Sequence, residues 1–304
     1  MTNYVHLLGN VTLPILLVCL FGAVLHRWKR VDTGTLADVG LYILAPCLMI
    51  TALTDTHVSG GNLLAVLGFT IVDTILCWGA ALLFSWMFRL QPDTVAATTL
   101  TTIFGNANNY GLPVLLLAFG TSGFSLGATY VVGQIILVNT LGMYVASRST
   151  GTIRQSFTQI LKAPLIYAAI MGLILYALRL HLPGSIDTTF RLVGNAYPVI
   201  VLLILGIQLS KMKWSGVRHR GVWVAVGLRI VLVPLISITT LKLLGIHGLL
   251  AAVLFVESSM PAAVNTIVLV EKYGGNKDVA ALTVAITTVV SFLTLPFLIH
   301  IHVV

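Results

Sequence analysis

Long apolar runs separated by short polar gaps constrain this chain more than any other feature of its sequence. Ten such runs follow one another. A helix needs roughly 20 apolar residues to cross the hydrocarbon core of a bilayer, so ten crossings fit. The runs do not alternate in character every second residue, as strands of a membrane β-barrel would. The sequence therefore predicts an all-α membrane protein with ten transmembrane helices.

The predicted helices are numbered 1 to 10 in chain order. They cover residues 5–25, 35–54, 62–88, 94–119, 122–147, 160–180, 190–210, 216–243, 247–270 and 278–300.

The composition agrees with a membrane protein. Only 9% of the residues are charged and 58% are hydrophobic, whereas soluble domains have roughly 25% charged residues. The net charge of +8 is a property of many nucleic-acid-binding proteins. Here the basic residues lie in the gaps between apolar runs, where membrane orientation explains them. We therefore expect a lipid bilayer, and no nucleic acid, as a partner.

The basic residues also predict the orientation. Of the 17 Lys and Arg residues, thirteen lie on the side of the first loop, which carries Arg27, Lys29 and Arg30. Three lie on the opposite side, and Arg229 lies inside helix 8. Positive charge favours the cytoplasmic side, so both termini are expected outside the cytoplasm. The basic cluster follows the first apolar run, whereas a cleaved signal peptide carries its charges before it.

The two halves of the chain resemble each other. Several proline and glycine positions recur at an offset close to 150 residues. The pairs are Pro14 and Pro164, Gly22 and Gly172, Pro46 and Pro198, and Pro113 and Pro261. They indicate a duplicated five-helix unit, with repeats 1–151 and 152–304. Because five is odd, the second repeat enters the membrane the opposite way, as in the inverted repeats of many secondary transporters.

Polar clusters interrupt helices 4 and 9 near their middles. Helix 4 contains FGNANNYGLP, with Asn106, Asn108, Asn109, Gly111 and Pro113, and helix 9 contains ESSMPAAVN, with Glu257, Pro261 and Asn265. We interpret Gly111, Pro113 and Pro261 as the breaks, since proline removes a backbone donor. Irregular backbone at this depth is tolerated only inside protein or at a wet cavity. Two breaks that cross therefore predict a binding site formed by the four asparagines, although prolines and glycines can also merely kink membrane helices.

Three ionisable residues lie well inside apolar runs, and an intramembrane charge is a functional hypothesis by default. Asp73 is interpreted as a proton or cation site, or as a structural hydrogen-bond partner of Gln134 or an asparagine. Arg229 can grip a carboxylate bidentately, or pair with Asp73 or Glu257. Glu257 can couple to the substrate or pair with Arg229.

The sequence contains no motif typical of catalysis. It has no GxSxG, HExxH or Walker motif, and no histidine spacing typical of a metal site. We predict no metal, no cofactor and no enzyme, but a secondary carrier of a small organic anion such as a carboxylate. A proton or a sodium ion is the expected coupling ion. A membrane-embedded enzyme or a channel is the alternative.

At the interrupted helices the chain resembles a known family. GNANNYGLP resembles the first crossover motif of the auxin efflux carrier family, which includes plant auxin exporters and bacterial carriers of malonate and similar acids. The stretch SSMPAAVNTIVLVEKYGGNKDVAALTVAITTVVSFLTLP resembles that family's second crossover and last helix. The resemblance covers essentially the whole chain.

This resemblance implies an elevator-type carrier and often a homodimer. Helices 1, 2, 6 and 7 would form a scaffold, and helices 3–5 and 8–10 a moving transport domain. Asn106 matches the asparagine that faces the substrate carboxylate, and Asp73 and Gln134 resemble a polar support site. The short gap between helices 5 and 6 differs from the long loop of many plant members, and this favours a compact carrier of a bacterial inner membrane.

Overall fold

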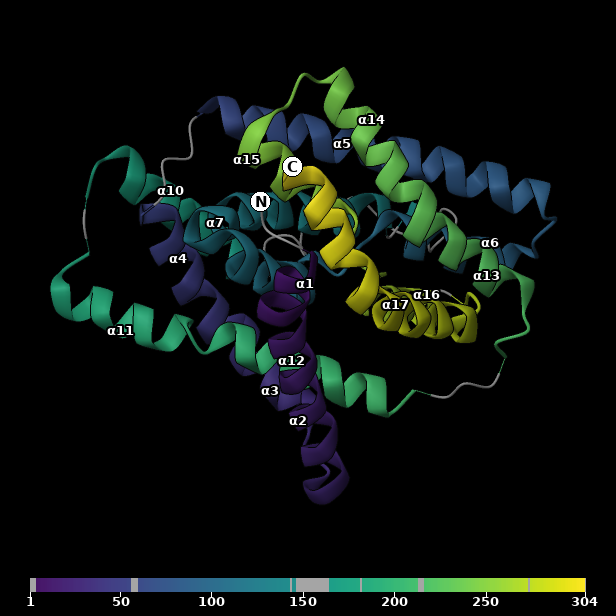
Figure 1. Cartoon of the computed structure of the whole chain (residues 1–304), viewed down its shortest axis with the longest axis horizontal. Coiled ribbons are helices and arrows are strands. Elements are labelled where there is room, and N and C mark those ends of the chain that lie inside the picture. Colours follow the sequence, from purple (N-terminus) through teal and green to yellow (C-terminus); the bar gives the residue numbers. More distant parts are fainter. Residues whose placement is uncertain are drawn as a thin grey trace.

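The computed structural model describes residues 4–55, 60–142, 144–145, 164–180, 182–212, 216–272 and 274–303. These residues are nearly all helical, with one isolated β-bridge among them (Figure 1). The boundary expected between the repeats, at residues 151 and 152, lies outside the described residues.

Several long helices contain a π-helical stretch, labelled η. In chain order the elements are α1 (Tyr4–Leu7), η1 (Leu8–Thr12), α2 (Leu13–Lys29), α3 (Thr33–Val39), η2 (Gly40–Leu44), α4 (Ala45–Asp55), α5 (Gly60–Met87), α6 (Pro92–Ile103), η3 (Ala107–Gly111), α7 (Leu112–Leu137), η4 (Val138–Gly142), α10 (Pro164–Ala177), α11 (Gly184–Gly194), α12 (Tyr197–Ser210), α13 (Arg220–Gly227), η5 (Leu228–Leu232), α14 (Val233–Leu243), α15 (Gly248–Ser258), α16 (Asn265–Lys272) and α17 (Lys277–Val303).

Seven helical stretches of the described chain are long and apolar enough to cross a membrane. They are Tyr4–Lys29, Thr33–Thr54, Gly61–Met87, Ala107–Gly142, Gly184–Ser210, Arg220–Leu243 and Lys277–Ile301. Two shorter apolar helices are Pro164–Ala177 and Gly248–Ser258. The all-helical, multi-pass membrane class is therefore confirmed, whereas the number of ten crossings stays a prediction.

Differences from the predicted helices have local causes. Ala107–Gly142 joins part of predicted helix 4 to helix 5. Within it Gly120 has φ +67° and ψ −160°, a conformation that only glycine adopts easily, so the chain bends there between the two predicted helices. Predicted helix 7 starts earlier than expected, at Gly184, and a turn at Asn195–Ala196 separates α11 from α12.

The helices form two groups. In the first, α2 packs on α12, and α4 packs on α10 and α11; in the second, α5, α6, α13, α14, α16 and α17 pack on one another. Figure 1 shows the first group at the lower left and the second at the upper right. Helix α7 contacts α4 in the first group and α5 in the second, and it also packs on α15.

Glycines allow very close helix packing within the first group. A Cβ atom at Gly22 of α2 would overlap the backbone carbonyl of Leu203 in α12, and one at Gly172 of α10 would lie 2.9 Å from the Cβ of Leu53 in α4. Only glycine therefore fits at these two contacts.

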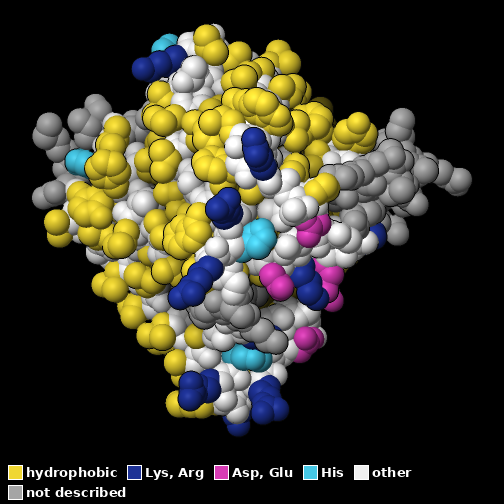
Figure 2. Space-filling model, turned by 90° about the vertical axis from the view of Figure 1, so that its right-hand side faces the viewer, with side chains coloured by type: hydrophobic (Ala, Val, Ile, Leu, Met, Phe, Trp, Pro, Cys, Tyr) yellow, Lys and Arg dark blue, Asp and Glu magenta, His cyan; other side chains and the backbone are white. Residues whose placement is uncertain are grey.

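The surface is dominated by apolar side chains. Figure 2 shows hydrophobic side chains over most of the upper and left part of one face, with Asp and Glu toward the right and Lys and Arg scattered from the top to the bottom. On α2 alone, the side chains of Leu20, Phe21 and Trp28 are more than half exposed. A surface of this kind is suited to lipid rather than water.

Candidate functional site

The two broken helices meet through their backbones. The first break, Phe104–Asn106, separates α6 from η3, and the second, Ser259–Val264, separates α15 from α16. The amide of Asn106 donates to the carbonyl of Pro261 (2.7 Å), and the amide of Ala263 donates to that of Phe104 (3.0 Å). These bonds form an antiparallel bridge between Gly105 and Ala262. We call this arrangement the helix crossing. It pairs backbone groups that lipid would leave unsatisfied.

Two of the residues interpreted as breaks lie beyond the first break. Gly111 ends η3 with helical dihedral angles, and Pro113 is the second residue of α7, directly after this π-helical stretch. Pro261 lies within the second break and accepts the hydrogen bond from Asn106. The interruption of helix 4 therefore includes Asn106 and comes before Asn108 and Asn109. Asn106 lies at the N-cap position of the helix that follows, where its backbone carbonyl, rather than its side chain, accepts from the amides of Tyr110 and Gly111.

One side of the helix crossing is occupied by Arg229, a buried residue of η5. Its guanidinium donates to three backbone carbonyls: Nε to Met260 (2.7 Å), Nη1 to Thr102 (2.6 Å) and Nη2 to Ser258 (2.8 Å). Thr102 and Ser258 lie at the C-terminal ends of α6 and α15. Carbonyls at helix ends lack partners inside the helix. We call these three carbonyls with Arg229 the carbonyl face.

Arg229 was expected to bind substrate, or to pair with Asp73 or Glu257. The hydrogen bonds that its guanidinium makes in the described part of the chain go to carbonyls instead. A Cβ atom at Gly105 would overlap this guanidinium. Glycine at position 105 therefore leaves room for the arginine.

The other side of the helix crossing opens into a cavity of about 350 Å³. The described residues that line it include four asparagines and Gln134, and none of these described residues is Lys, Arg, Asp, Glu or His. The lining residues are Leu41, Tyr42, Phe104, Gly105, Asn106, Ala107, Asn108, Asn109, Val131, Gln134, Ile135, Val138, Pro164, Ala263, Val264, Asn265, Thr266 and Leu269.

The cavity is bordered by the starts of two helices. Residues Ala107–Asn109 form the first turn after the first break, and Asn265–Thr266 the first turn after the second. Amides in the first turn of a helix generally lack a partner inside it, although the amide of Thr266 donates to the carbonyl of Ala263 just before α16 (3.1 Å). The helix dipole favours negative charge at both helix starts. We call these two first turns the amide face. The Nδ2 atom of the buried Asn106 side chain also has no hydrogen-bond partner in the described structure.

Gln134 and Asp73, expected to form one support site, have separate partners in the structure. Gln134 lines the cavity, and its Nε2 donates to the hydroxyl of Tyr130 (2.9 Å). Asp73 is buried in α5, where its Oδ1 accepts from the hydroxyl of Ser237 in α14 (2.9 Å). Asp73 is not among the residues that line the cavity.

Glu257 lies behind the helix crossing in α15. It is fully buried, and neither carboxylate oxygen has a hydrogen-bond partner in the described structure. Cβ atoms at Gly111 or Gly127 would overlap or crowd this carboxylate. These glycines therefore provide the space in which the acid sits.

Supporting contacts come from residues that sequence reasoning did not identify. The hydroxyl of Thr287 in α17 accepts from the amide of Ala262 in the second break (3.1 Å). The hydroxyl of Tyr197 in α12 donates to Oδ1 of Asn108 (2.8 Å). In the sequence, the threonines of TVAITTVV were the one feature that could have pointed to Thr287 as a polar contact. No sequence feature pointed to Tyr197.

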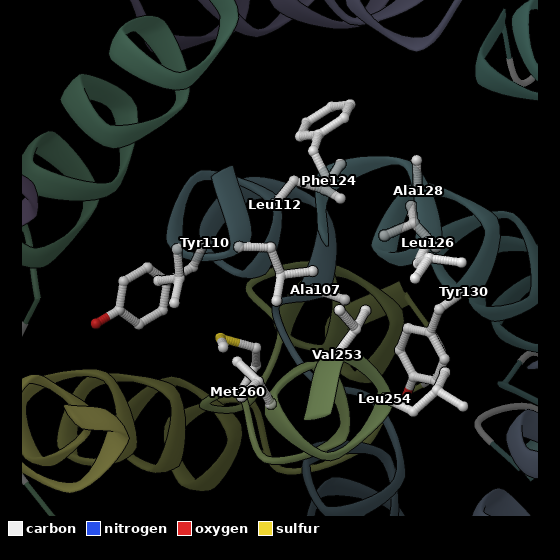
Figure 3. Packing of buried hydrophobic residues seen from close by; sticks show 14 of the residues in the cluster. Ala107, Tyr110, Leu112, Phe124, Leu126, Ala128, Tyr130, Val253, Leu254 and Met260 are labelled. Carbon is white, nitrogen blue, oxygen red and sulfur yellow. The ribbon is translucent and has the colours of Figure 1, made fainter. Parts of the chain in front are cut away.

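Apolar packing holds the helix crossing in place. Figure 3 shows Val253 of α15 beside Ala107 of η3, and Leu254 beside Tyr130 of α7. These side chains are buried in one hydrophobic cluster, so close packing holds the helices next to the cavity in position. Among the described residues, no cluster of three or more His, Cys, Asp or Glu could hold a metal ion.

Comparisons with known proteins give a consistent result. The model of a family described as membrane transport protein matches residues 9–156 and 149–299. An uncharacterized transporter of Methanocaldococcus jannaschii is 26% identical over 293 residues, which cover 94% of both chains. An uncharacterized transporter of Methanothermobacter thermautotrophicus is 25% identical over 292 residues, covering 93% of this chain and 95% of that protein.

Proposed function

The chain belongs to the membrane transport protein family, whose members resemble auxin efflux carriers, and on this premise we propose that it is a secondary carrier of small organic anions. The transported group is a carboxylate, and the site is the cavity at the amide face. The family gives transport across a membrane; the anion follows from the difference between the two faces of the helix crossing.

The observation that carries the proposal is that, among the described residues, a side chain fills the carbonyl face, whereas the amide face borders a cavity. On the carbonyl face, the acceptors of Thr102, Ser258 and Met260 receive donors from Arg229. On the amide face, first-turn amides and the unpartnered Nδ2 of Asn106 border an open cavity. A site rich in free donors is suited to a ligand rich in acceptors, which describes a carboxylate.

The neutral lining also fits a carrier rather than a trap. Asparagine side chains and helix starts attract an anion with partial charges, and none of the described residues that line the cavity is cationic. A site must bind its cargo weakly enough to release it. The volume of about 350 Å³ limits the cargo to a small acid.

Uptake into proteoliposomes tests this function. Purified protein is reconstituted, and entry of labelled malonate, succinate and benzoate is measured against that of protein-free vesicles. Saturable entry of at least one acid, inhibited by the same unlabelled acid, is expected. Entry no faster than in protein-free vesicles for any acid, together with rapid flux of an inorganic ion, would favour a channel instead.

We further propose that the two halves are inverted repeats. Gly22 packs on Leu203, and Gly172 packs on Leu53. Gly172 stands 150 positions after Gly22, and Leu203 stands 150 positions after Leu53. Each close glycine contact between halves thus has a counterpart in which the halves exchange roles, as a two-fold axis requires. This supports ten crossings, which place both termini on the same side, and the basic residues of the first loop favour the outside of the cytoplasm for them. A reporter fused after Val304 that is active only in the cytoplasm would contradict that orientation.

The two helix groups support an elevator movement. The group with α2, α4, α10 and α12 would be the scaffold and the site of a homodimer contact in the cell membrane, and the other group would carry the cavity. The hydroxyl of Ser125 in α7 donates to the carbonyl of Ala52 in α4 (2.7 Å), so it links the groups. Cysteines at 52 and 125, in a background without Cys19, Cys47 and Cys77, should form a cross-link that stops transport and preserves binding. Full transport by the cross-linked protein would exclude the movement.

Asp73 is the proposed coupling residue. It is a buried carboxylate near the buried Arg229 in the same helix group. If it carries a proton, transport should vary with pH and Asp73→Asn should abolish that variation. Sodium dependence in place of pH dependence would assign the cation instead. Wild-type transport by Asp73→Asn throughout a pH and sodium series would remove Asp73 from coupling.

A further inference from the structure

Three side chains form a hydrogen-bonded chain that begins in α12 and ends at the cavity. The hydroxyl of Tyr197 donates to Oδ1 of Asn108 (2.8 Å). The Nδ2 of Asn108 donates to Oδ1 of Asn109 (3.1 Å). Both asparagines line the cavity. Each amide oxygen in this chain therefore already has a donor.

The direction of these hydrogen bonds decides whether the cavity binds a ligand with acceptor groups or one with donor groups. An asparagine amide offers an acceptor at one end and two donors at the other. Since the oxygens of Asn108 and Asn109 are used within the chain, the groups left for a ligand are N–H donors. If both amides were turned over, they would present an oxygen to the ligand, and the site would favour a donor such as a neutral amide.

Tyr197 occupies the fixed end of the chain. It is fully buried at the first position of α12, directly before Pro198, and it follows the turn that separates α11 from α12. Its hydroxyl also lies 3.2 Å from the backbone carbonyl of Asn108. The Tyr197 hydroxyl can therefore donate to either of two oxygens of Asn108, the backbone carbonyl or the side-chain Oδ1. The distance to Oδ1 is the shorter one.

We propose that Tyr197 is a specificity-determining positioning residue, which orients Asn108 and Asn109 so that they present N–H donors and the cavity selects a carboxylate over the corresponding carboxamide. This inference rests on the proposed function and adds to it the residue that sets the preference. Tyr197 is not among the residues that line the cavity, so it acts through Asn108.

The test compares each acid with its neutral amide. Binding of malonate against malonamide, and of benzoate against benzamide, is measured by calorimetry on the purified full chain. Tyr197→Phe keeps the ring and removes the donor, which leaves Oδ1 of Asn108 free to turn. A hydrogen bond of this kind is worth roughly fivefold to tenfold in affinity. The preference for the acid is expected to fall by about that factor, with the affinity for the amide unchanged or higher.

Tyr110→Phe is the matched control. Tyr110 is a buried tyrosine of η3 whose hydroxyl accepts from Ser291 (3.3 Å), and it does not line the cavity. Its loss removes a buried hydroxyl beside the same break and should leave the preference unchanged. Asn108→Ala, a second variant, should reduce the preference like Tyr197→Phe. The double variant should show little further loss, because both changes break one chain.

The outcomes separate the inference from the proposed function. A wild-type protein that binds neither acid more tightly than its amide contradicts the proposed function and, with it, this inference. A wild-type protein that prefers the acid, with the same preference in Tyr197→Phe, overturns the inference alone. Equal weakening of acid and amide in Tyr197→Phe, or additive losses in the double variant, would also overturn it, since each would mean a merely structural role.

Discussion

On one face of the helix crossing two helices end, and on the other two helices begin. The ending helices, α6 and α15, leave carbonyls that Arg229 fills from inside the protein. The beginning helices, η3 and α16, leave amides that border the cavity. Among the described residues, the same break in a helix thus produces a hydrogen-bonded arginine on one side and donors that border a cavity on the other. We therefore expect substitutions at the carbonyl face to lower stability and, under the proposed function, substitutions at the amide face to lower binding.

Removal of Arg229 should have the largest effect. Arg229→Ala leaves the carbonyls of Thr102, Ser258 and Met260 buried without donors. Each unsatisfied acceptor costs about 1–3 kcal/mol, so the free energy of unfolding should fall by about 3 kcal/mol or more, out of a typical total of about 5–15 kcal/mol. Thermal unfolding in detergent measures the loss. Arg229→Lys keeps the charge and should be intermediate; a wild-type melting temperature in Arg229→Ala would mean that the carbonyl face does not stabilise the fold.

Substitutions on the amide face should lower the affinity for substrate and leave the stability of the fold unchanged. Asn106→Ala and Asn265→Ala remove donors to the carboxylate while the helix crossing keeps its backbone bonds. A hydrogen bond to a charged group is worth about 1.5–3 kcal/mol, which is roughly tenfold to over a hundredfold in affinity. Calorimetry with the transported acid should show this loss at an unchanged melting temperature. Wild-type affinity in both variants would reduce the amide face to a structural break.

A methyl group at Gly105 should disturb the carbonyl face from within. The added Cβ would overlap the Arg229 guanidinium, which its three hydrogen bonds hold in place. Overpacking of this kind costs about 1–3 kcal/mol, measured again by thermal unfolding. Gly79→Ala in α5 is the control: apart from the nearby backbone of its own helix and its chain neighbours, no atom lies within 4 Å of the added Cβ. A helical Gly→Ala change should stabilise by up to about 1 kcal/mol. Equal melting temperatures for the two variants would contradict the crowding.

Loss of the N-cap of α3, a helix start outside the helix crossing, should have the smallest effect on stability. It serves as a reference for the helix starts of the amide face. Asp32 caps α3, where it accepts from the Thr35 hydroxyl (2.7 Å) and from the amides of Thr35 and Gly34. The hydrogen bond from the Thr35 hydroxyl, followed by those from the two amides, lowers the pKa of Asp32 from 3.8 to about 2. Its stabilisation should be complete above the unfolded pKa of about 3.9 and be lost as the pH falls through about 2.

Melting temperatures measured from pH 7 down to pH 2 test this cap. Asp32→Ala should melt slightly below the wild type at pH 7, and the difference should disappear near pH 2. Asp38→Ala, which removes an acid from the same helix α3 but not from its N-cap, is the matched control. A difference that persists unchanged at pH 2 would mean that the carboxylate is not the stabilising group.

The sequence was sufficient for the helical class and for the locations of both polar interruptions. Prolines and asparagines inside apolar runs have few physical explanations, so FGNANNYGLP and ESSMPAAVN pointed directly to them. The sequence did not show which residues of the two breaks pair with each other. Backbone amides and carbonyls form this pairing, and nearly every residue type carries both groups. The first break consequently lies before Gly111 and Pro113, which fit into the helix that follows.

Arg229 and Tyr197 illustrate a second limit. An arginine in an apolar run indicates a buried partner, and acids were the natural expectation. Backbone carbonyls at two helix ends satisfied it instead, and only the fold brings those ends together. Tyr197 is one of nine tyrosines, and its position at the start of α12 gives no local signal. Its importance depends on a contact with Asn108, which is 89 positions away in the chain.

The backbone hydrogen bonds of the helix crossing also have a kinetic consequence. They run from Asn106 to Pro261 and from Ala263 to Phe104. They join both halves of the site, so the proposed movement would carry the cavity as one unit and leave its internal distances unchanged. The cargo would then meet the same donors whichever side of the membrane the cavity faces. Half-saturation concentrations measured from the two sides should therefore be similar, and any net accumulation must come from the electrochemical gradient of the cargo or of a coupled ion.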